Sequence, residues 1–156
     1  MERRLAHTYG LFHPVVHVWI LDGKNQLLIQ QRSKNMVVYP LYWDSSASGH
    51  YDAGETKEKG AMRELKEELG LKTNLKYIGY ADVEHKIKNA HHKERVHYFW
   101  GRSNGTPRLQ QSEVNGFRRV PLNQIPAFIR QHTMTHTFMG GWRKFGGLIG
   151  KLGVRH

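Results

Sequence analysis

The 156-residue chain contains no cysteine, which excludes disulfide bonds, thiolate metal sites and a cysteine nucleophile. It also lacks an apolar run of the about 18 residues that a membrane helix needs. Its amino-terminal residues, Met-Glu-Arg-Arg-Leu-Ala, include no apolar segment of signal-peptide length. Because these absences together fit a reducing compartment, we expect a cytoplasmic protein.

Acidic residues are scarce: 13 Asp and Glu stand against 24 Lys and Arg, so the formal net charge is +11. Such a field favours anionic partners, among them nucleotides, phosphate esters, and RNA or another polyanion. The 38% hydrophobic content is that of a globular domain. We expect a single domain over residues 1–131, followed by a basic, glycine-rich tail over 132–156 that belongs to the same domain or is partly disordered.

The hydrophobic pattern alternates between strand-like and helix-like segments. It predicts strands at 15–21, 27–32, 75–81, 96–102 and 117–120. It predicts helices over 56–69 and from Pro121 to about 131, and a His- and Lys-rich loop over 84–95. This order predicts an α/β fold with a mixed β-sheet between helices.

Six of the thirteen acidic residues fall within residues 49–71. Glu64, Glu67 and Glu68 stand at i, i+3 and i+4, so a helix places their three carboxylates on one face. Like charges at this spacing repel unless a cation lies between them. Because hard divalent cations prefer clustered carboxylate oxygens, the pattern predicts a site for Mg²⁺, with Mn²⁺ as an alternative.

Residues 49–71 also match the pattern Gly-x5-Glu-x7-Arg-Glu-U-x-Glu-Glu-x-Gly-U, where U is a bulky aliphatic residue, at all nine specified positions. This stretch resembles the Nudix box. The resemblance implies the Nudix fold, an α/β/α sandwich with a mixed β-sheet in which the box forms a loop, a helix and a loop. It also implies metal-dependent hydrolysis of a diphosphate bond, in a nucleoside diphosphate linked to another moiety or in a related diphosphate substrate.

The resemblance assigns roles within the box. Glu64, Glu67 and Glu68, with the backbone carbonyl of Gly49, are the candidate metal ligands. Glu64 and Glu67 are also candidate catalytic residues, because Glu64 or a neighbouring ligand can take the proton of the attacking water. Arg63 is the third candidate catalytic residue, since it lies four positions before Glu67 and can orient that carboxylate.

Many Nudix enzymes place one further acid beyond the box, and two residues here are candidates. Glu94 opens the predicted strand 96–102, whereas Glu113 precedes Phe117-Arg-Arg-Val-Pro-Leu, which resembles a segment common in the family. We favour Glu94 as the additional metal ligand. For the substrate, the candidates are Arg32, Tyr39, whose ring can stack on a base or an apolar group, and His50.

A second resemblance extends beyond the box to about residues 7–121. The segments 12–21, 26–33 and 39–50 resemble isopentenyl-diphosphate isomerase, a relative with the Nudix fold. That resemblance implies a metal site built from histidines and glutamates. The matching positions are His13, His50 and Glu94, with His7 as a further candidate.

The chain departs from the isomerase at two positions. Ser48 stands where the isomerase has a catalytic cysteine, and a serine hydroxyl, with its much higher pKa, is a poor replacement in proton transfer. His92 stands where the isomerase has a glutamate. Because the box is also intact, we predict a hydrolase of the isomerase-like branch, with isomerase activity on isoprenoid diphosphates as the alternative.

Two further alternatives stay open. A non-catalytic module that binds phosphate or RNA is the alternative from another class of protein, although binding alone does not require four mutually repelling box carboxylates. For His17, which alternates with Val16 and Val18, we favour a structural role in the core or in a cleft. The identity of the substrate and the oligomeric state, including a homodimer, are not determined by the sequence.

Overall fold

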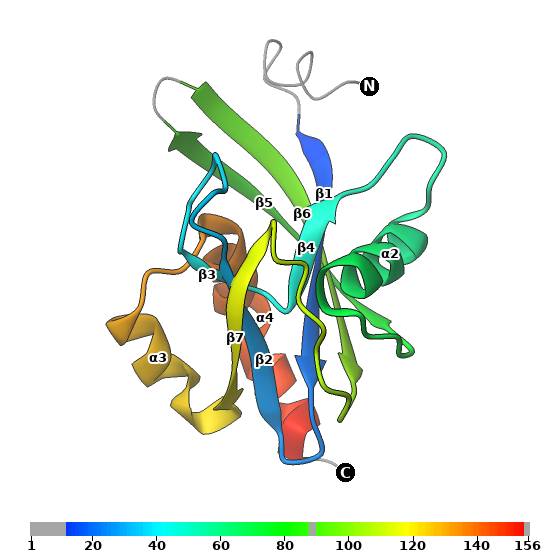
Figure 1. Ribbon diagram of the computed structural model, residues 1–156, viewed down its shortest axis with the longest axis vertical. Helices are drawn as coiled ribbons and strands as arrows, with labels where there is room; N and C mark the ends of the chain where they lie inside the picture. Colours follow the sequence, from blue (N-terminus) through cyan, green and yellow to red (C-terminus); the bar gives the residue numbers. More distant parts are fainter. Residues whose placement is uncertain (1–11, 88–89, 155–156) are drawn as a thin grey trace.

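The computed structural model describes residues 12–87 and 90–154, and within them a mixed seven-stranded sheet lies between helices (Figure 1). The strands are β1 (His13–Leu21), β2 (Gln26–Arg32), β3 (Trp43–Asp44), β4 (Ala47–His50), β5 (Lys76–Ile87), β6 (Ala90–Arg102) and β7 (Val114–Pro121). The helices are α2 (Lys57–Leu69), α3 (Ile125–Gln131) and α4 (His136–Val154), with a 3-10 turn, η1 (Leu122–Gln124), before α3. The predicted α/β class with a mixed sheet is confirmed.

Strand β1 organises the sheet. It runs parallel to β6 along its whole length and antiparallel to β4. It pairs with β2 only at Ile20–Leu28 and Leu21–Leu27. Beyond these two pairs, β2 pairs with β3 and β7 instead of β1. The sheet therefore splits into one part that contains β1, β4, β5 and β6 and another that contains β2, β3 and β7. The opening between these parts is where the site described below lies.

Strand β1 contributes side chains to two hydrophobic cores, one on each face of the sheet, because successive side chains of a strand point to opposite faces. Even-numbered residues pack with the buried side chains of α2 (Val16, Val18, Ile20, Ala61, Leu65, Leu69). Odd-numbered residues pack on the other face with those of α3 and α4 (Val15, Trp19, Leu21, Phe128, Phe138, Ile149). Strand β1 is thus buried on both faces, and the predicted strand at 15–21 is confirmed.

Helix α2 carries the acidic stretch and begins and ends as its sequence predicts. The Thr56 side chain accepts a hydrogen bond from the Lys59 amide at 3.1 Å and caps the first turn. Gly70 adopts φ 64°, in the left-handed region, and its amide bonds to the carbonyl of Lys66. These two caps fix the length of the helix and therefore the position of its glutamates.

The predicted loop over 84–95 is wrong. Strands β5 and β6 form one long antiparallel hairpin in which Glu84 pairs with Lys93 and His85 with His92. Polar side chains hid these strands from the hydrophobic pattern. Pairing of backbone groups does not require apolar side chains, and His85 is buried here in a cavity rather than in a hydrophobic core.

The predicted tail also holds a helix that the sequence pattern did not predict. Helix α4 packs on the sheet through aromatic and aliphatic residues (Phe138, Trp142, Phe145, Ile149, Leu152). Its glycines lower helix propensity and hid it. They also permit close packing: a Cβ on Gly141 would collide with the ring of Tyr98, and one on Gly140 would lie 2.8 Å from Val83. The division of the domain at residue 131 stays a prediction.

Across residues 12–87 and 90–154, the structure contains no helix with the length and apolar character required to span a bilayer.

Candidate active site

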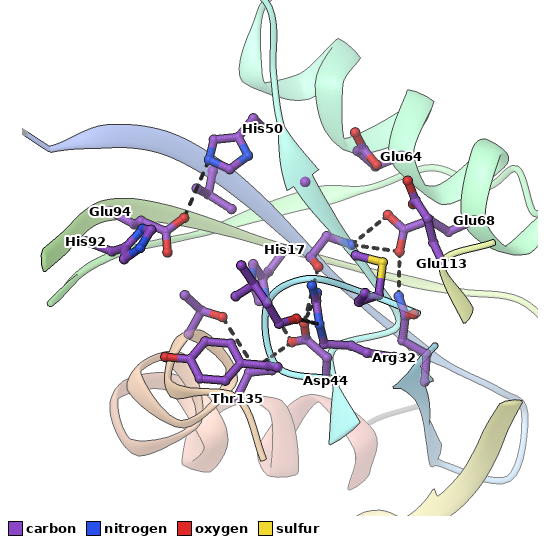
Figure 2. A pocket seen from close by; sticks show the side chains of 18 of the residues that line it. His17, Arg32, Asp44, His50, Glu64, Glu68, His92, Glu94, Glu113 and Thr135 are labelled. Carbon is purple, nitrogen blue, oxygen red and sulfur yellow. Dashed lines mark hydrogen bonds and ion pairs between the residues drawn. The ribbon is translucent and has the colours of Figure 1, made fainter. Parts of the chain in front are cut away.

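A cavity of ≈ 680 Å³ occupies the opening where β1 and β2 separate. In Figure 2, Glu64, Glu68 and Glu113 lie on one side of the cavity and His50, His92 and Glu94 on another, whereas His17, Arg32 and Asp44 belong to neither group. One group, which we call the carboxylate wall, consists of Glu64, Glu68 and Glu113. The other, the histidine wall, consists of His13, His50, His85, His92 and Glu94.

In the carboxylate wall, Glu64 and Glu68 are buried one helical turn apart, and each carboxyl group affects the pKa of the other. Gln30 donates from Nε2 to Oε1 of Glu68 at 2.5 Å, and the Ser48 amide approaches the same carboxyl at 3.3 Å. Burial raises the pKa of Glu64, and burial together with the Glu64 carboxyl raises the pKa of Glu68 well above its usual range. Two acids held together in this way are suited to a divalent cation.

Gly49 lies against this pair. A Cβ at this position would collide with the carboxyl group of Glu64, so any residue other than glycine would displace that carboxyl group. The backbone of Gly49 on β4 therefore lies beside the two buried carboxyl groups. This geometry fits its predicted role as a carbonyl ligand next to Glu64 and Glu68.

Arg63 connects the box residues around the cavity. Its guanidinium donates to both oxygens of Glu55 at 2.9 and 3.0 Å, to Glu64 at 2.9 Å and to Glu67 at 3.2 Å. It also donates to the backbone carbonyl of His50 at 3.1 Å. The bidentate pair with Arg63, with the amide of Asp52, lowers the pKa of Glu55 to about 2. Arg63 thus orients Glu64 as well as the predicted Glu67.

The histidine wall contains a group that can hold a metal ion: ligand atoms of His13, His50 and Glu94 lie within 4.8 Å of one another. The His13 and His50 rings stack with centroids 5.0 Å apart, and His50 Nε2 lies 3.6 Å from Glu94 Oε2. His85 Nε2 lies 2.7 Å from the other Glu94 oxygen. Burial acts to raise the pKa of Glu94, but the hydrogen bond with His85 and the neighbouring histidines outweigh it, and the pKa is lowered.

The three predicted substrate-binding residues, Arg32, Tyr39 and His50, all line the cavity. Tyr39 adopts φ 52°, which is unusual for a non-glycine residue, and its hydroxyl lies 2.6 Å from Nδ1 of His85. Arg32 donates to the carbonyl of Val38 at 3.0 Å. Arg32 therefore holds the loop that carries Tyr39 over the cavity.

The predicted metal ligands do not all lie together. Glu94 belongs to the histidine wall, whereas Glu113 lies beside Glu68 and adds to the raising of its pKa (Figure 2). Glu67 is not among the cavity-lining residues; its side chain is 51% exposed and contacts Arg63. His7 lies outside the described residues.

Two cavity residues were not predicted. His85 was assigned to a loop, and only recognition of the hairpin register, which places Val83 opposite Glu94, would have directed attention to it. Asp44 is buried on the cavity floor, where it accepts hydrogen bonds from the Ser45 amide at 2.8 Å and from Thr135 Oγ1 at 2.9 Å. Thr135 comes from the segment predicted as a tail, so no local pattern connects the two.

A mixed sheet between helices, with a capped helix that presents glutamates beside Gly49 of a neighbouring strand, is the arrangement that the box predicts. The family model of the NUDIX domain matches residues 11–139. The chain therefore belongs to the Nudix family.

Similar proteins agree with this assignment. An uncharacterized Nudix hydrolase of Listeria innocua is 52% identical over 66 residues, which are 42% of this chain and 39% of that protein, so the match spans less than half of this relative. An isopentenyl-diphosphate Delta-isomerase 2 of Photorhabdus laumondii is 30% identical over 84% of this chain and 75% of its own length. Among solved structures, a MutT protein from Methanosarcina mazei has the same fold, with a TM-score of 0.70 and 21% identity over 90% of this chain and 94% of that chain.

Proposed function

We propose that the protein is a metal-dependent Nudix pyrophosphohydrolase that cleaves the diphosphate bond of a nucleoside diphosphate linked to another moiety, or of a related diphosphate. One observation carries this proposal. Glu64 and Glu68 of the intact box form a buried pair of neighbouring acids, with Gly49 against Glu64, at a cavity of ≈ 680 Å³. A buried pair of acids is costly unless a cation or a shared proton compensates it.

The donor set of the carboxylate wall fits a hard cation. Glu64, Glu68 and the carbonyl of Gly49 would hold Mg²⁺ or Mn²⁺, with Glu67 at the outer side of the helix and Glu113 beside Glu68. A bound divalent ion neutralises diphosphate oxygens and lowers the pKa of a coordinated water. Without the glutamate oxygens, the wall could not hold a cation, and the negative charge of the diphosphate would not be neutralised there.

Hydrolysis also needs a proton acceptor. Water attacks one phosphorus, the bond from that phosphorus to the bridging oxygen breaks, and the proton of the water passes to a carboxylate. Glu64 is the proposed acceptor. The guanidinium of Arg63, 2.9 Å from Oε1 of Glu64, holds this carboxylate in position before substrate binds.

The other cavity residues supply substrate contacts. Arg32 offers a positive charge and Tyr39 an aromatic ring, and both lie on the side of the cavity that β2 and its following loop form. His50 reaches the cavity from β4, one residue after Gly49. We propose that Arg32 and His50 bind phosphate oxygens, and that Tyr39 packs on the moiety linked to the diphosphate.

A second candidate function is supported by the histidine wall. The His13, His50 and Glu94 group is the metal site that the isomerase resemblance implies. Against isomerisation stands Ser48, whose hydroxyl donates to Asp44 Oδ2 at 3.3 Å and whose pKa is far above that of a cysteine thiol. Hydrolysis therefore remains the proposed activity.

The test is product analysis by phosphorus-31 NMR for a panel of nucleoside diphosphate derivatives, which would yield two phosphomonoesters, and isoprenoid diphosphates, which would release phosphate. Each reaction is run with Mg²⁺, with Mn²⁺ and with EDTA. We expect at least one substrate to be cleaved with metal and none with EDTA. Double-bond migration in isopentenyl diphosphate without phosphate release would instead support the isomerase. Binding without turnover would support a non-catalytic module.

A further inference from the structure

His17 lies on the cavity floor between the two walls, and neither wall accounts for it (Figure 2). It is 1% exposed and pairs across the sheet with Ser48 on β4 and Tyr98 on β6. The sequence favoured a structural role for it. Its hydrogen bonds indicate a more specific one.

The Nδ1 atom of His17 lies 2.6 Å from Oγ of Ser45, and the indole nitrogen of Trp19 lies 2.8 Å from the same oxygen. Trp19 can only donate, so Ser45 Oγ accepts there. Ser45 is fully buried, and among residues 12–87 and 90–154 its hydroxyl has no other bonded partner. Its single proton is satisfied only if it is donated to Nδ1 of His17.

Asp44 does not change this assignment. Its Oδ1 lies 3.7 Å from Nδ1 of His17, beyond hydrogen-bonding distance. The same oxygen already accepts from the Ser45 amide and from Thr135 Oγ1. Burial, moreover, lowers the pKa of His17, which favours the neutral ring. In a neutral ring with an unprotonated Nδ1, the proton is on Nε2.

From these contacts we infer that His17 is a substrate-binding residue, whose Nε2–H, held by the chain from Trp19 through Ser45, donates a hydrogen bond to an oxygen of the substrate's diphosphate. The inference rests on the proposed function and deepens it. No partner for Nε2 is found within the described part of the chain, although the residue lines the cavity. Within residues 12–87 and 90–154, the one fully buried side-chain polar atom without a hydrogen-bond partner is Gln110 Oε1, so Nε2 of His17 is accessible from the cavity. A phosphate oxygen there can accept its proton.

The assignment also separates His17 from the metal ligands. A nitrogen that carries a proton has no lone pair for a cation, so Nε2 of His17 does not compete with His13, His50 and Glu94 for a metal ion. The floor of the cavity therefore offers the diphosphate a fixed neutral donor between two walls that each suit a cation.

The first test is nitrogen-15 NMR of the intact protein with labelled histidine, in which the His17 signals are identified by their absence in H17Q. We expect a protonated Nε2 and an unprotonated Nδ1 at neutral pH. Methylenediphosphonate, a diphosphate that water does not cleave, added with Mg²⁺, should move the Nε2 proton downfield. A proton on Nδ1, protons on both nitrogens, or an Nε2 signal that the diphosphonate leaves unchanged would overturn the inference.

A matched pair of variants supplies the second test. Glutamine places its amide nitrogen near the position of Nε2, whereas asparagine reaches only to that of Nδ1. We expect H17N to lower kcat/KM on the order of 10–100-fold, and H17Q to restore most of that loss. Equal losses in two folded variants would contradict a donor at Nε2. If no substrate of the panel is cleaved but the NMR shift is present, the proposed hydrolysis fails and the His17 assignment stands.

Discussion

The two walls of the cavity differ in the atoms they present and in how the chain builds them. The carboxylate wall comes mainly from one capped helix and presents oxygen atoms. The histidine wall comes from β1, β4 and the β5–β6 hairpin and presents mostly nitrogen atoms. Oxygen donors suit Mg²⁺, whereas imidazole suits transition metals such as Zn²⁺ or Mn²⁺ alongside a carboxylate. One cavity thus presents two chemically different donor sets, only one of which the box motif predicts.

The largest effect is expected at the carboxylate wall. Glu64→Gln removes the proposed proton acceptor and one metal ligand, and kcat should fall about 10²–10⁴-fold. Steady-state hydrolysis of the best panel substrate measures it. Glu58→Gln, a matched change on the exposed first turn of the same helix, should leave kcat unchanged. Similar losses in both variants would show that the effect is not specific to the wall.

The histidine wall should respond to a change behind its ligands. His85→Phe removes the hydrogen bond to Glu94 and should weaken Mn²⁺ or Zn²⁺ binding at this wall about 10–100-fold, while Mg²⁺ binding at the other wall is retained. Isothermal titration calorimetry measures both affinities. His91→Phe, on the exposed side of the same hairpin, is the control. An equal loss of affinity for both ions would mean that the two walls do not bind metal independently.

The close approach of β4 to α2 can be tested at Gly49. Gly49→Ala forces a methyl group against the Glu64 carboxyl and should destabilise the fold by about 1–3 kcal/mol. Gly116→Ala, which meets open space on β7, should change stability by less than about 0.5 kcal/mol. Urea denaturation of the two variants gives the comparison. Equal stability would argue against the tight packing of strand and helix.

The smallest effect is the dependence of stability on pH through Glu55. Its pKa of about 2 in the folded protein lies below the value of about 4.3 in an unfolded chain. The unfolded state therefore binds the proton first, so the stabilisation is fully present above the unfolded pKa and is lost as the pH falls toward 2. Denaturation midpoints between pH 5 and about 2 should fall less steeply for Glu55→Gln than for the wild type. Identical slopes would show that the pair with Arg63 does not form.

The sequence predicts the carboxylate wall better than the histidine wall for a physical reason. Helix spacing is local, so the helix over 56–69 and the common face of Glu64 and Glu68 could be predicted from residues within one turn of one another. The histidine wall depends on strand register between distant segments. His85 reaches Glu94 only because the hairpin pairs Val83 with Glu94.

The same distinction applies to the fold. Apolar strands such as β1 were predicted, as were the segments 75–81 and 96–102 of the hairpin, whereas the polar end of the hairpin and the glycine-rich α4 were not. In α4, glycine lowers the propensity that a pattern detects but permits the approach of Gly141 to Tyr98. Long-range packing therefore determines the elements that local propensity misses.

The central claim, that water cleaves a diphosphate bond at the carboxylate wall, can be tested most directly by hydrolysis in ¹⁸O-labelled water with Mg²⁺, followed by phosphorus-31 NMR. We predict that the label enters one phosphate product of a cleaved diphosphate, and that Glu64→Gln slows this incorporation about 10²–10⁴-fold. Absence of labelled phosphate from every diphosphate tested, or incorporation that Glu64→Gln does not reduce, would contradict it.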